Sequence, residues 1–216
     1  MKSILIIGLG RFGSHLCKDF ARLDNEIMIV DRSEERLEDL LPLVTNAKIG
    51  DCTNEKVLKS LGVGNFDICF VCIGDNFQSS LEITSLLKDL GANYVVSKAK
   101  RDIHAKFLLR NGADEVIYPD RDIAEKVAVR FSANQVFDYV ELDNEYSIYE
   151  IAPLPEWIGK TIKEVNVRVE YNTNIIGVKD KNGMHLMPHA DYLFKTDEHL
   201  MVIGHQKDIT RILKKL

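Results

Sequence analysis

An apolar run near the amino terminus, Ile4-Leu5-Ile6-Ile7, leads directly into the turn Gly8-Leu9-Gly10-Arg11-Phe12-Gly13. The glycines follow a G-x-G-x-x-G spacing between a strand-length run and a helical pattern, which is where a nucleotide-binding turn is expected. Gly8 suits the tight turn, Gly10 lets backbone N–H groups approach a phosphate, and Gly13 lets the helix pack close to the strand. Phosphates would then lie at a helix amino terminus, which favours negative charge.

A second strand-like run, Glu26 to Val30, ends at Asp31. This is the position where an acidic side chain can hydrogen-bond both ribose hydroxyls of an adenine nucleotide. We therefore include Asp31 and its neighbour Arg32 in the predicted site. A purely structural glycine turn is the alternative interpretation.

Strand and helix patterns alternate through the first 119 residues. Further strands are expected at 46–50, 66–73, 94–97 and 115–118, and helices at 12–23, from 34 to near Pro42, 54–61, 78–90 and 103–111. Six strands alternating with helices predict an α/β fold with a doubly wound parallel sheet of the Rossmann type.

Polar turns follow several of these strands and would meet at the carboxyl edge of the sheet, where open α/β sheets place ligand contacts. The candidate residues in them are Asp51, Cys52, Thr53, Ile73, Gly74, Asn76 and Lys98. Asp51 and Thr53 would contact adenine or ribose, or they cap the following helix. Lys98 would contact a phosphate, or it is an ordinary exposed lysine.

The four cysteines are too few for a disulfide framework. Cys69 and Cys72 match C-x-x-C but lie in a strand-like run, where an odd offset points the two thiols to opposite faces. We interpret them as buried small residues rather than a metal or redox pair. His185 and His189 are four apart, yet Gly183 and Pro188 favour a turn-rich strand region there.

Charge and hydropathy exclude several classes of function. The net charge is −5 and the basic residues form no long cluster, so nucleic acid is not an expected partner. No apolar run reaches the ~18 residues that span a bilayer. We expect a cytoplasmic protein without membrane insertion, and a length of 216 residues suits two domains.

The pattern changes after Pro119. Residues 120–137 are expected to form crossover helices, with Ile123, Val127 and Phe131 in an i, i+4 row that requires a partner subunit or a second domain. Residues 138–216 read as a small α+β domain with strands at 146–151, 174–179 and 199–204, a helical turn at 162–165 and a closing helix from Gln206. The predicted boundaries are 1–119, 120–137 and 138–216.

Together these motifs resemble the cytosolic gating subunits of Ktr and Trk potassium transporters, the RCK family, over the whole chain. The resemblance rests on Ile7 to Gly13, Val30-Asp31, Gly50 to Thr53, Ile73 to Asn76, Lys98-Ala99-Lys100, Gly112-Ala113-Asp114 with Pro119, and Ile203-Gly204. It implies a nucleotide-binding Rossmann domain, a crossover helix and a small C-terminal domain.

The resemblance also implies ligands and partners. Family members bind ATP, ADP or NAD(H), form homodimers that assemble into octameric rings, and act beneath a membrane-embedded potassium transporter subunit. By position, Arg11 would contact phosphates, with Phe12 beside it, and Asp31 would hold the ribose. Asp120 falls where some members place an acidic ligand, usually glutamate, for a divalent cation at the dimer interface.

Some members also bind cyclic di-AMP between two C-terminal domains. The matching residues are Ile162, Arg168, Asn174, Ile175 and Pro188. The alternative is that Arg168 is a surface residue and that the isoleucines belong to the core of a small domain.

The resemblance predicts a non-catalytic regulatory subunit of a potassium transporter, peripheral to the membrane through its partner. An NAD-dependent oxidoreductase would share the glycine motif and Asp31, but no motif places an acid–base group and the second domain is small for a substrate cleft. A free-standing nucleotide sensor is the third hypothesis.

Overall fold

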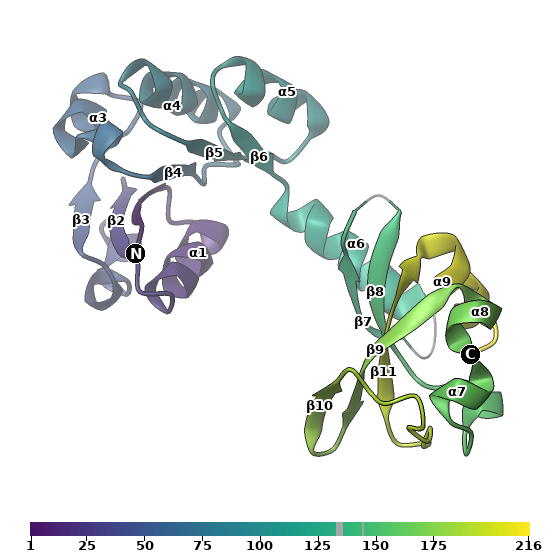
Figure 1. Ribbon diagram of the computed structural model, residues 1–216. Coiled ribbons are helices and arrows are strands. Elements are labelled where there is room, and N and C mark those ends of the chain that lie inside the picture. Colours follow the sequence, from purple (N-terminus) through teal and green to yellow (C-terminus); the bar gives the residue numbers. More distant parts are fainter. Residues whose placement is uncertain (133–135, 144) are drawn as a thin grey trace. The chain divides into compact units, whose positions relative to one another are not determined.

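Two β-sheets form, one in each half of the chain (Figure 1). The computed structural model describes residues 1–132, 136–143 and 145–216, which divide into two compact units, Met1–Arg121 and Asp122–Leu216. The first unit has a six-stranded parallel sheet and the second a five-stranded antiparallel sheet. The predicted fold class, a doubly wound parallel sheet followed by a small α+β domain, is confirmed.

The sheet of the first unit has the order β3-β2-β1-β4-β5-β6. Its strands are β1 (Ser3–Ile7), β2 (Glu26–Asp31), β3 (Asn46–Ile49), β4 (Ile68–Val71), β5 (Val95–Lys98) and β6 (Glu115–Ile117). The helices are α1 (Arg11–Ala21), α2 (Glu35–Glu38), α3 (Glu55–Leu61), α4 (Phe77–Asp89) and α5 (Asp102–Arg110), with 3₁₀ turns η1 (Leu41–Leu43) and η2 (Val63–Asn65).

Helices cover both faces of this sheet, so its central strands are apolar on both sides. Leu5 and Cys69 point toward α3 and α4, while Ile6 and Cys72 point toward α1 and α2. The prediction that the two thiols of the C-x-x-C run face opposite ways is therefore confirmed.

The helix expected from residue 34 to Pro42 is wrong in length. α2 ends at Glu38, and the chain continues through two tighter turns in which Leu40 N–H donates to the carbonyl of Leu37 and Leu43 N–H to that of Leu40. Leu37 and Leu40 are both buried, so the tighter winding places two apolar side chains on α1 within a few residues.

The sheet of the second unit has the order β10-β9-β11-β8-β7. Its strands are β7 (Val136–Glu141), β8 (Tyr146–Ile151), β9 (Thr173–Asp180), β10 (Gly183–Leu186) and β11 (His199–His205). The helical elements are α6 (Pro119–Ser132), which crosses the unit boundary, then η3 (Pro155–Trp157), α7 (Ile162–Val165), α8 (Val167–Tyr171) and α9 (Gln206–Leu213).

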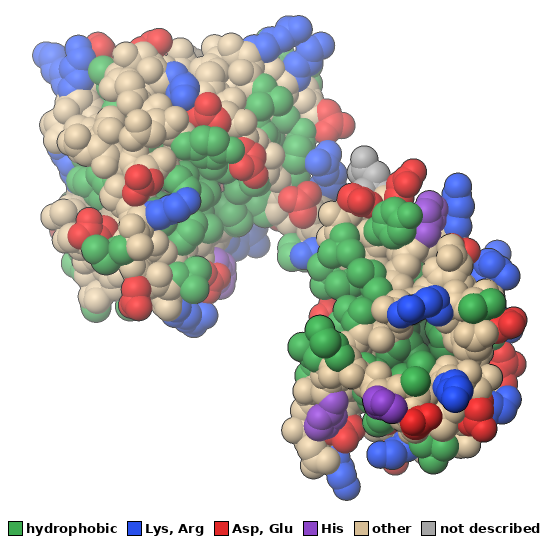
Figure 2. All heavy atoms as spheres, in the orientation of Figure 1, with side chains coloured by type: hydrophobic (Ala, Val, Ile, Leu, Met, Phe, Trp, Pro, Cys, Tyr) green, Lys and Arg blue, Asp and Glu red, His purple; other side chains and the backbone are tan. Residues whose placement is uncertain are grey.

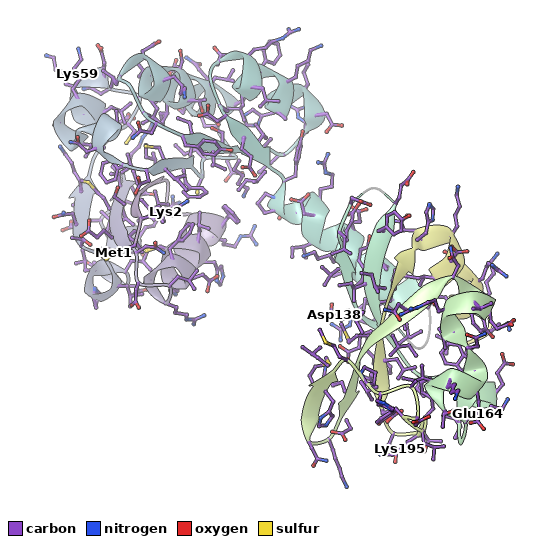
Figure 3. The ribbon with its side chains drawn as sticks, viewed as in Figure 1. Met1, Lys2, Lys59, Asp138, Glu164 and Lys195 are labelled. Carbon is purple, nitrogen blue, oxygen red and sulfur yellow. The ribbon has the colours of Figure 1, made fainter. Side chains whose placement is uncertain are left out.

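The core of this unit lies between one sheet face and the helices α8 and α9, with Trp157 and Phe194 at its centre. α7 begins with a capping box, in which Thr161 and Glu164 each accept from the other's backbone N–H. Figure 3 labels Glu164 in the second unit. Hydrophobic and charged side chains are mixed on the visible surface of each unit (Figure 2).

Several expectations for the second half need correction. Val136 and Phe137 begin strand β7 instead of ending the crossover helices, and residues 133–135 of that predicted segment lie outside the described residues. No helix was expected at α8, and the closing helix, expected over Gln206 to Leu216, ends at Leu213. The turn-rich strand region around His185 is confirmed as β10.

The burial of His104 on α5 predicts a pH-dependent stability of the first unit. Its ring packs 4.8 Å from that of Phe77, and within the described part of the chain Nε2 has no hydrogen-bond partner. Burial, with a smaller effect of Arg101, lowers the pKa of His104. A depressed histidine pKa means that the native state favours the neutral ring, so this stability is complete above pH ~6.5 and is lost as the pH falls below it.

We expect His104→Leu to remove this dependence. The urea midpoint of the natural protein should fall between pH 7.5 and pH 5, and that of His104→Leu should fall less, since each unit of pKa shift corresponds to about 1.4 kcal/mol. His15→Leu, which changes an exposed histidine of α1, is the control. Identical pH profiles for His104→Leu and the natural protein would contradict this account.

Candidate functional site

A cleft of about 270 Å³ opens at the carboxyl ends of β1, β2 and β4. The sheet order reverses between β1 and β4, so the cleft lies at the topological switch point where open α/β sheets bind ligands. Its lining contains eight of the predicted site residues: Gly8, Gly10, Asp31, Arg32, Cys52, Ile73, Gly74 and Asn76.

The glycine turn forms one wall of this cleft. Gly8 has φ +91°, a conformation that L side chains rarely adopt, and its N–H donates to the carbonyl of Val30 at 2.9 Å. A Cβ on Gly13 would overlap the carbonyl of Gly8, so the helix needs glycine there to approach the strand. Gly13 thus allows α1 to pack against the turn that lines the cleft.

Gly10 is the N-cap of α1, and no side chain caps this helix. Gly10 lines the cleft, and a Cβ at this position would have no heavy atom within 4 Å, so the turn is open around Gly10. Unpaired N–H groups at a helix amino terminus attract anions. The turn therefore has the shape and the polarity to hold a phosphate.

Asp31 lines the cleft beside the glycine turn and is 8% exposed. Its Oδ2 accepts from Leu9 N–H at 2.7 Å and its Oδ1 from Ser33 N–H at 2.9 Å, while Arg36 Nη1 lies 3.5 Å from Oδ2. An ionised carboxylate has about four lone-pair positions, so capacity remains for a ribose hydroxyl. Asp31 can therefore both hold the glycine turn and bind a ligand.

Asp51, Thr53 and Arg32 form a network beside the cleft. Asp51 Oδ1 accepts from Thr53 N–H at 2.9 Å, from Thr53 Oγ1 at 2.7 Å and from Arg32 Nη2 at 2.8 Å. The Thr53 hydroxyl, assisted by Arg32, holds the pKa of Asp51 below its usual value. Asn54 caps α3, so Asp51 and Thr53 do not have the capping role that was their alternative interpretation.

Basic side chains gather at the rim near Gly74. Lys98 Nζ lies 5.6 Å from the ring centre of Phe12, and Lys100 pairs with Asp75. Arg11 is exposed at the first residue of α1. Asn76 caps α4 by accepting from Ser79 N–H at 3.0 Å.

Sequence analysis missed Arg36, Ser79, Ile83 and Asp75 as lining residues. Arg36 could have been inferred, because it lies in the short helix that begins just after Asp31. Cys72 also lines the cleft, and burial raises the pKa of Cys52 and of Cys72 to about 12, so both thiols are protonated at neutral pH.

The second unit brings two of its candidate residues together. Arg168 Nη2 donates to Asn174 Oδ1 at 3.2 Å on the surface. Ile175 is 8% exposed and belongs to the core, since neighbouring residues of a strand point to opposite faces. Ile162 and Pro188 are half-buried.

Asp120 is exposed in the first turn of α6. In the part of the chain that the structure describes, no three His, Cys, Asp or Glu side chains are grouped to hold a metal ion. Nor does any helix of residues 1–132, 136–143 and 145–216 have the length and apolar character to cross a membrane.

Two family models match this chain, the TrkA-N domain at residues 4–119 and the TrkA-C domain at residues 146–216. Ktr system potassium uptake protein C of Bacillus subtilis (strain 168) is 37% identical over 215 residues, which cover 100% of this chain and 97% of that one. Ktr system potassium uptake protein A of the same strain is 37% identical over 210 residues, covering 97% and 95%.

Solved structures agree in fold. The GsuK RCK domain superposes with a TM-score of 0.69 at 17% identity, covering 99% of this chain and 47% of that one. The GsuK channel bound to NAD gives 0.68 at 18% identity, with 96% and 38% covered, and GsuK bound to ADP gives 0.53 at 17% identity, with 60% and 34% covered. The chain thus spans less than half the length of these structures.

The family matches account for most of the chain, and the Ktr relatives match it end to end. The chain therefore belongs to the family of potassium uptake proteins that combine a TrkA-N with a TrkA-C domain.

Proposed function

We propose that this chain is a non-catalytic regulatory subunit that binds ATP, ADP or NAD(H) and gates a membrane-embedded potassium transporter. The observation that carries the proposal is the cleft, in which an open glycine turn faces Asp31 in a chain that matches Ktr proteins over its full length. The GsuK structures bound to NAD and to ADP support a nucleotide as the ligand. The protein would be cytoplasmic and would reach the membrane through its transporter partner.

In this proposal each part of a nucleotide has a matching group. Phosphates would meet the amino terminus of α1 at Gly10, with Arg11 and Lys98 supplying positive charge. The ribose hydroxyls would donate to Asp31. The adenine would lie toward Arg32 and the Asp51–Thr53 turn.

The cleft also bears on the alternative of an NAD-dependent oxidoreductase. Two carboxylates line the cleft: Asp31 accepts from backbone N–H groups, and Asp75 is paired with Lys100. Burial keeps the thiols of Cys52 and Cys72 protonated. None of these groups is arranged for acid–base or nucleophilic chemistry at neutral pH. These features favour a binding role over a catalytic one. Nucleotide binding would then gate a transporter or, as a second candidate function, belong to a free-standing sensor.

We propose that the exposed row of α6 forms a homodimer and contributes to an octameric ring. Ile123, Val127 and Phe131 are 60%, 48% and 75% exposed on one face of this helix. A row of large apolar side chains in water is typical of an interface. Asp120, near this row in sequence, would bind a divalent cation together with ligands from a second chain.

A further proposed ligand is cyclic di-AMP between two C-terminal domains. The ligand is two-fold symmetric, so a two-fold interface can present the Arg168–Asn174 pair to each half. Arg168 would bind a phosphate, and Ile162, Pro188 and the small exposed part of Ile175 would contact the purines.

Nucleotide selectivity tests the main proposal. By calorimetry, ATP, ADP or NAD(H) should bind, and NADP should bind at least about tenfold more weakly than NAD, because the 2′-phosphate would face the Asp31 carboxylate. Asp31→Asn, which keeps one acceptor oxygen, should narrow this difference. Equal affinities of the natural protein for NAD and NADP would refute the role of Asp31.

The dimer proposal is tested by Val127→Glu, which would place two carboxylates against each other in an apolar interface. Light scattering should report smaller species than for the natural protein. Ala128→Glu puts the same charge on an exposed position beside the row and should leave the assembly size unchanged. If Val127→Glu assembles normally, α6 is not a dimer element.

Equilibrium dialysis of the full chain tests cyclic di-AMP binding. One ligand should be retained per two chains, and Arg168→Ala should abolish retention because it removes the phosphate partner. Arg211→Ala, which removes an exposed arginine of α9, should retain the ligand. Absence of uptake by the natural, assembled protein would eliminate this site.

A further inference from the structure

Three side chains meet where the first unit ends. Asp102 is the first residue of α5, Tyr118 directly follows β6, and Arg121 lies in the first turn of α6. Arg121 Nη1 is 3.1 Å from Asp102 Oδ1, and its guanidinium carbon is 3.6 Å from the ring centre of Tyr118. We call these three residues the Arg121 clamp.

The clamp orients the guanidinium group of Arg121 more than it adds to the free energy of folding. The side chains of Arg121 and Asp102 are 58% and 88% exposed, and exposed ion pairs contribute little to the free energy of folding. A planar guanidinium held by a carboxylate and an aromatic face nevertheless has a defined orientation, which a lysine in its place would not have. The first turn of α6 is thereby tied to the amino terminus of α5.

The clamp is also connected to the rim of the cleft. Strand β5 ends at Lys98 and α5 begins at Asp102, so the segment between them is short. Lys100 in this segment pairs with Asp75, which lines the cleft. Ala99 is 2% exposed, and its N–H donates to the carbonyl of Ile117 at 2.9 Å. The residue after Ile117 is Tyr118, so the segment is anchored to the clamp through β6 as well.

An anion at the rim would compete with Asp75 for the ammonium group of Lys100, because both are negative partners for one cation. The segment is anchored at Ala99, which is buried and bonded to β6, while Lys100, Arg101 and Asp102 are exposed. Only Arg101 separates Lys100 from Asp102, so a change at Lys100 acts on Asp102 through a short backbone segment that is fixed at one end. The first compact unit ends at Arg121, the residue that Asp102 holds.

We propose that Arg121 is a positioning residue, which couples the ion pairing of Lys100 at the cleft rim to the first turn of α6. This inference rests on the proposed function only in taking the ligand of the cleft to be a nucleotide. The Arg121 clamp would thereby transmit the effect of ligand binding to α6.

Hydrogen–deuterium exchange of the full chain with and without ATP tests the proposal. The readout is the amides of residues 123–126, whose helical acceptors lie in residues 119–122. In the natural protein ATP should change their exchange. In Arg121→Gln they should exchange at least about fivefold faster without ligand and should no longer respond to ATP, while the calorimetric affinity for ATP stays within about twofold.

In Arg121→Lys, which keeps the charge but not the planar group, the exchange rate should lie between those of the natural protein and Arg121→Gln. Adding Asp102→Asn to Arg121→Gln should change the exchange rate little, because both changes remove the same Arg121–Asp102 ion pair. Arg110→Gln, the same change at the exposed end of α5, should behave as the natural protein. A normal ATP response of residues 123–126 in Arg121→Gln, or no response in a natural protein that binds ATP, would overturn the coupling.

A natural protein that binds neither ATP nor NAD would instead refute the proposed function. In that case the exchange of residues 123–126 without ligand still tests the clamp. Equal exchange rates in Arg121→Gln and the natural protein would overturn the positioning role of Arg121.

Discussion

The carboxylate of Asp31 joins the end of the second strand to the glycine turn after the first. One oxygen accepts from Leu9 N–H and the other from Ser33 N–H, at a site where each unpaired buried N–H would cost about 1–3 kcal/mol. The open space at Gly10 and the path of α1 depend on this turn. The residue that makes the cleft suitable for a ribose is thus also the one that holds the cleft in shape.

Much of the first unit could be predicted because its central strands are buried on both faces and because glycines such as Gly91 and Gly112 end the helices between them. Gly8, Asp31 and the turns after β3 and β4 were placed at one edge because the carboxyl ends of parallel strands meet there. Arg36 was missed, although it follows Asp31 closely in the chain, because an exposed arginine has no periodic pattern that points it toward the cleft. Asp51 was ambiguous until Asn54 proved to be the cap of α3.

The second unit was harder to predict, since its elements are short and only half-buried. β10 is exposed along all four residues, so no alternation of apolar and polar residues marks it as more than a turn-rich strand region. α8 is bounded by Asn166 and Asn172, both at positive φ, a conformation that a local pattern does not reveal. Ile175 had two interpretations, a ligand contact or a core residue, and strand alternation turns most of its side chain into the core while Asn174 lies outside.

In our proposal the ligand binds to the first unit, and the helix that begins at Pro119 transmits the effect of binding. The central claim is that each chain binds one nucleotide within an assembled ring, and native mass spectrometry of the purified protein with added ATP tests this most directly because it reads ligand mass and assembly size together. We expect an even-numbered assembly, an octamer, that carries one nucleotide per chain. A ligand-free monomer in the presence of ATP would contradict the account.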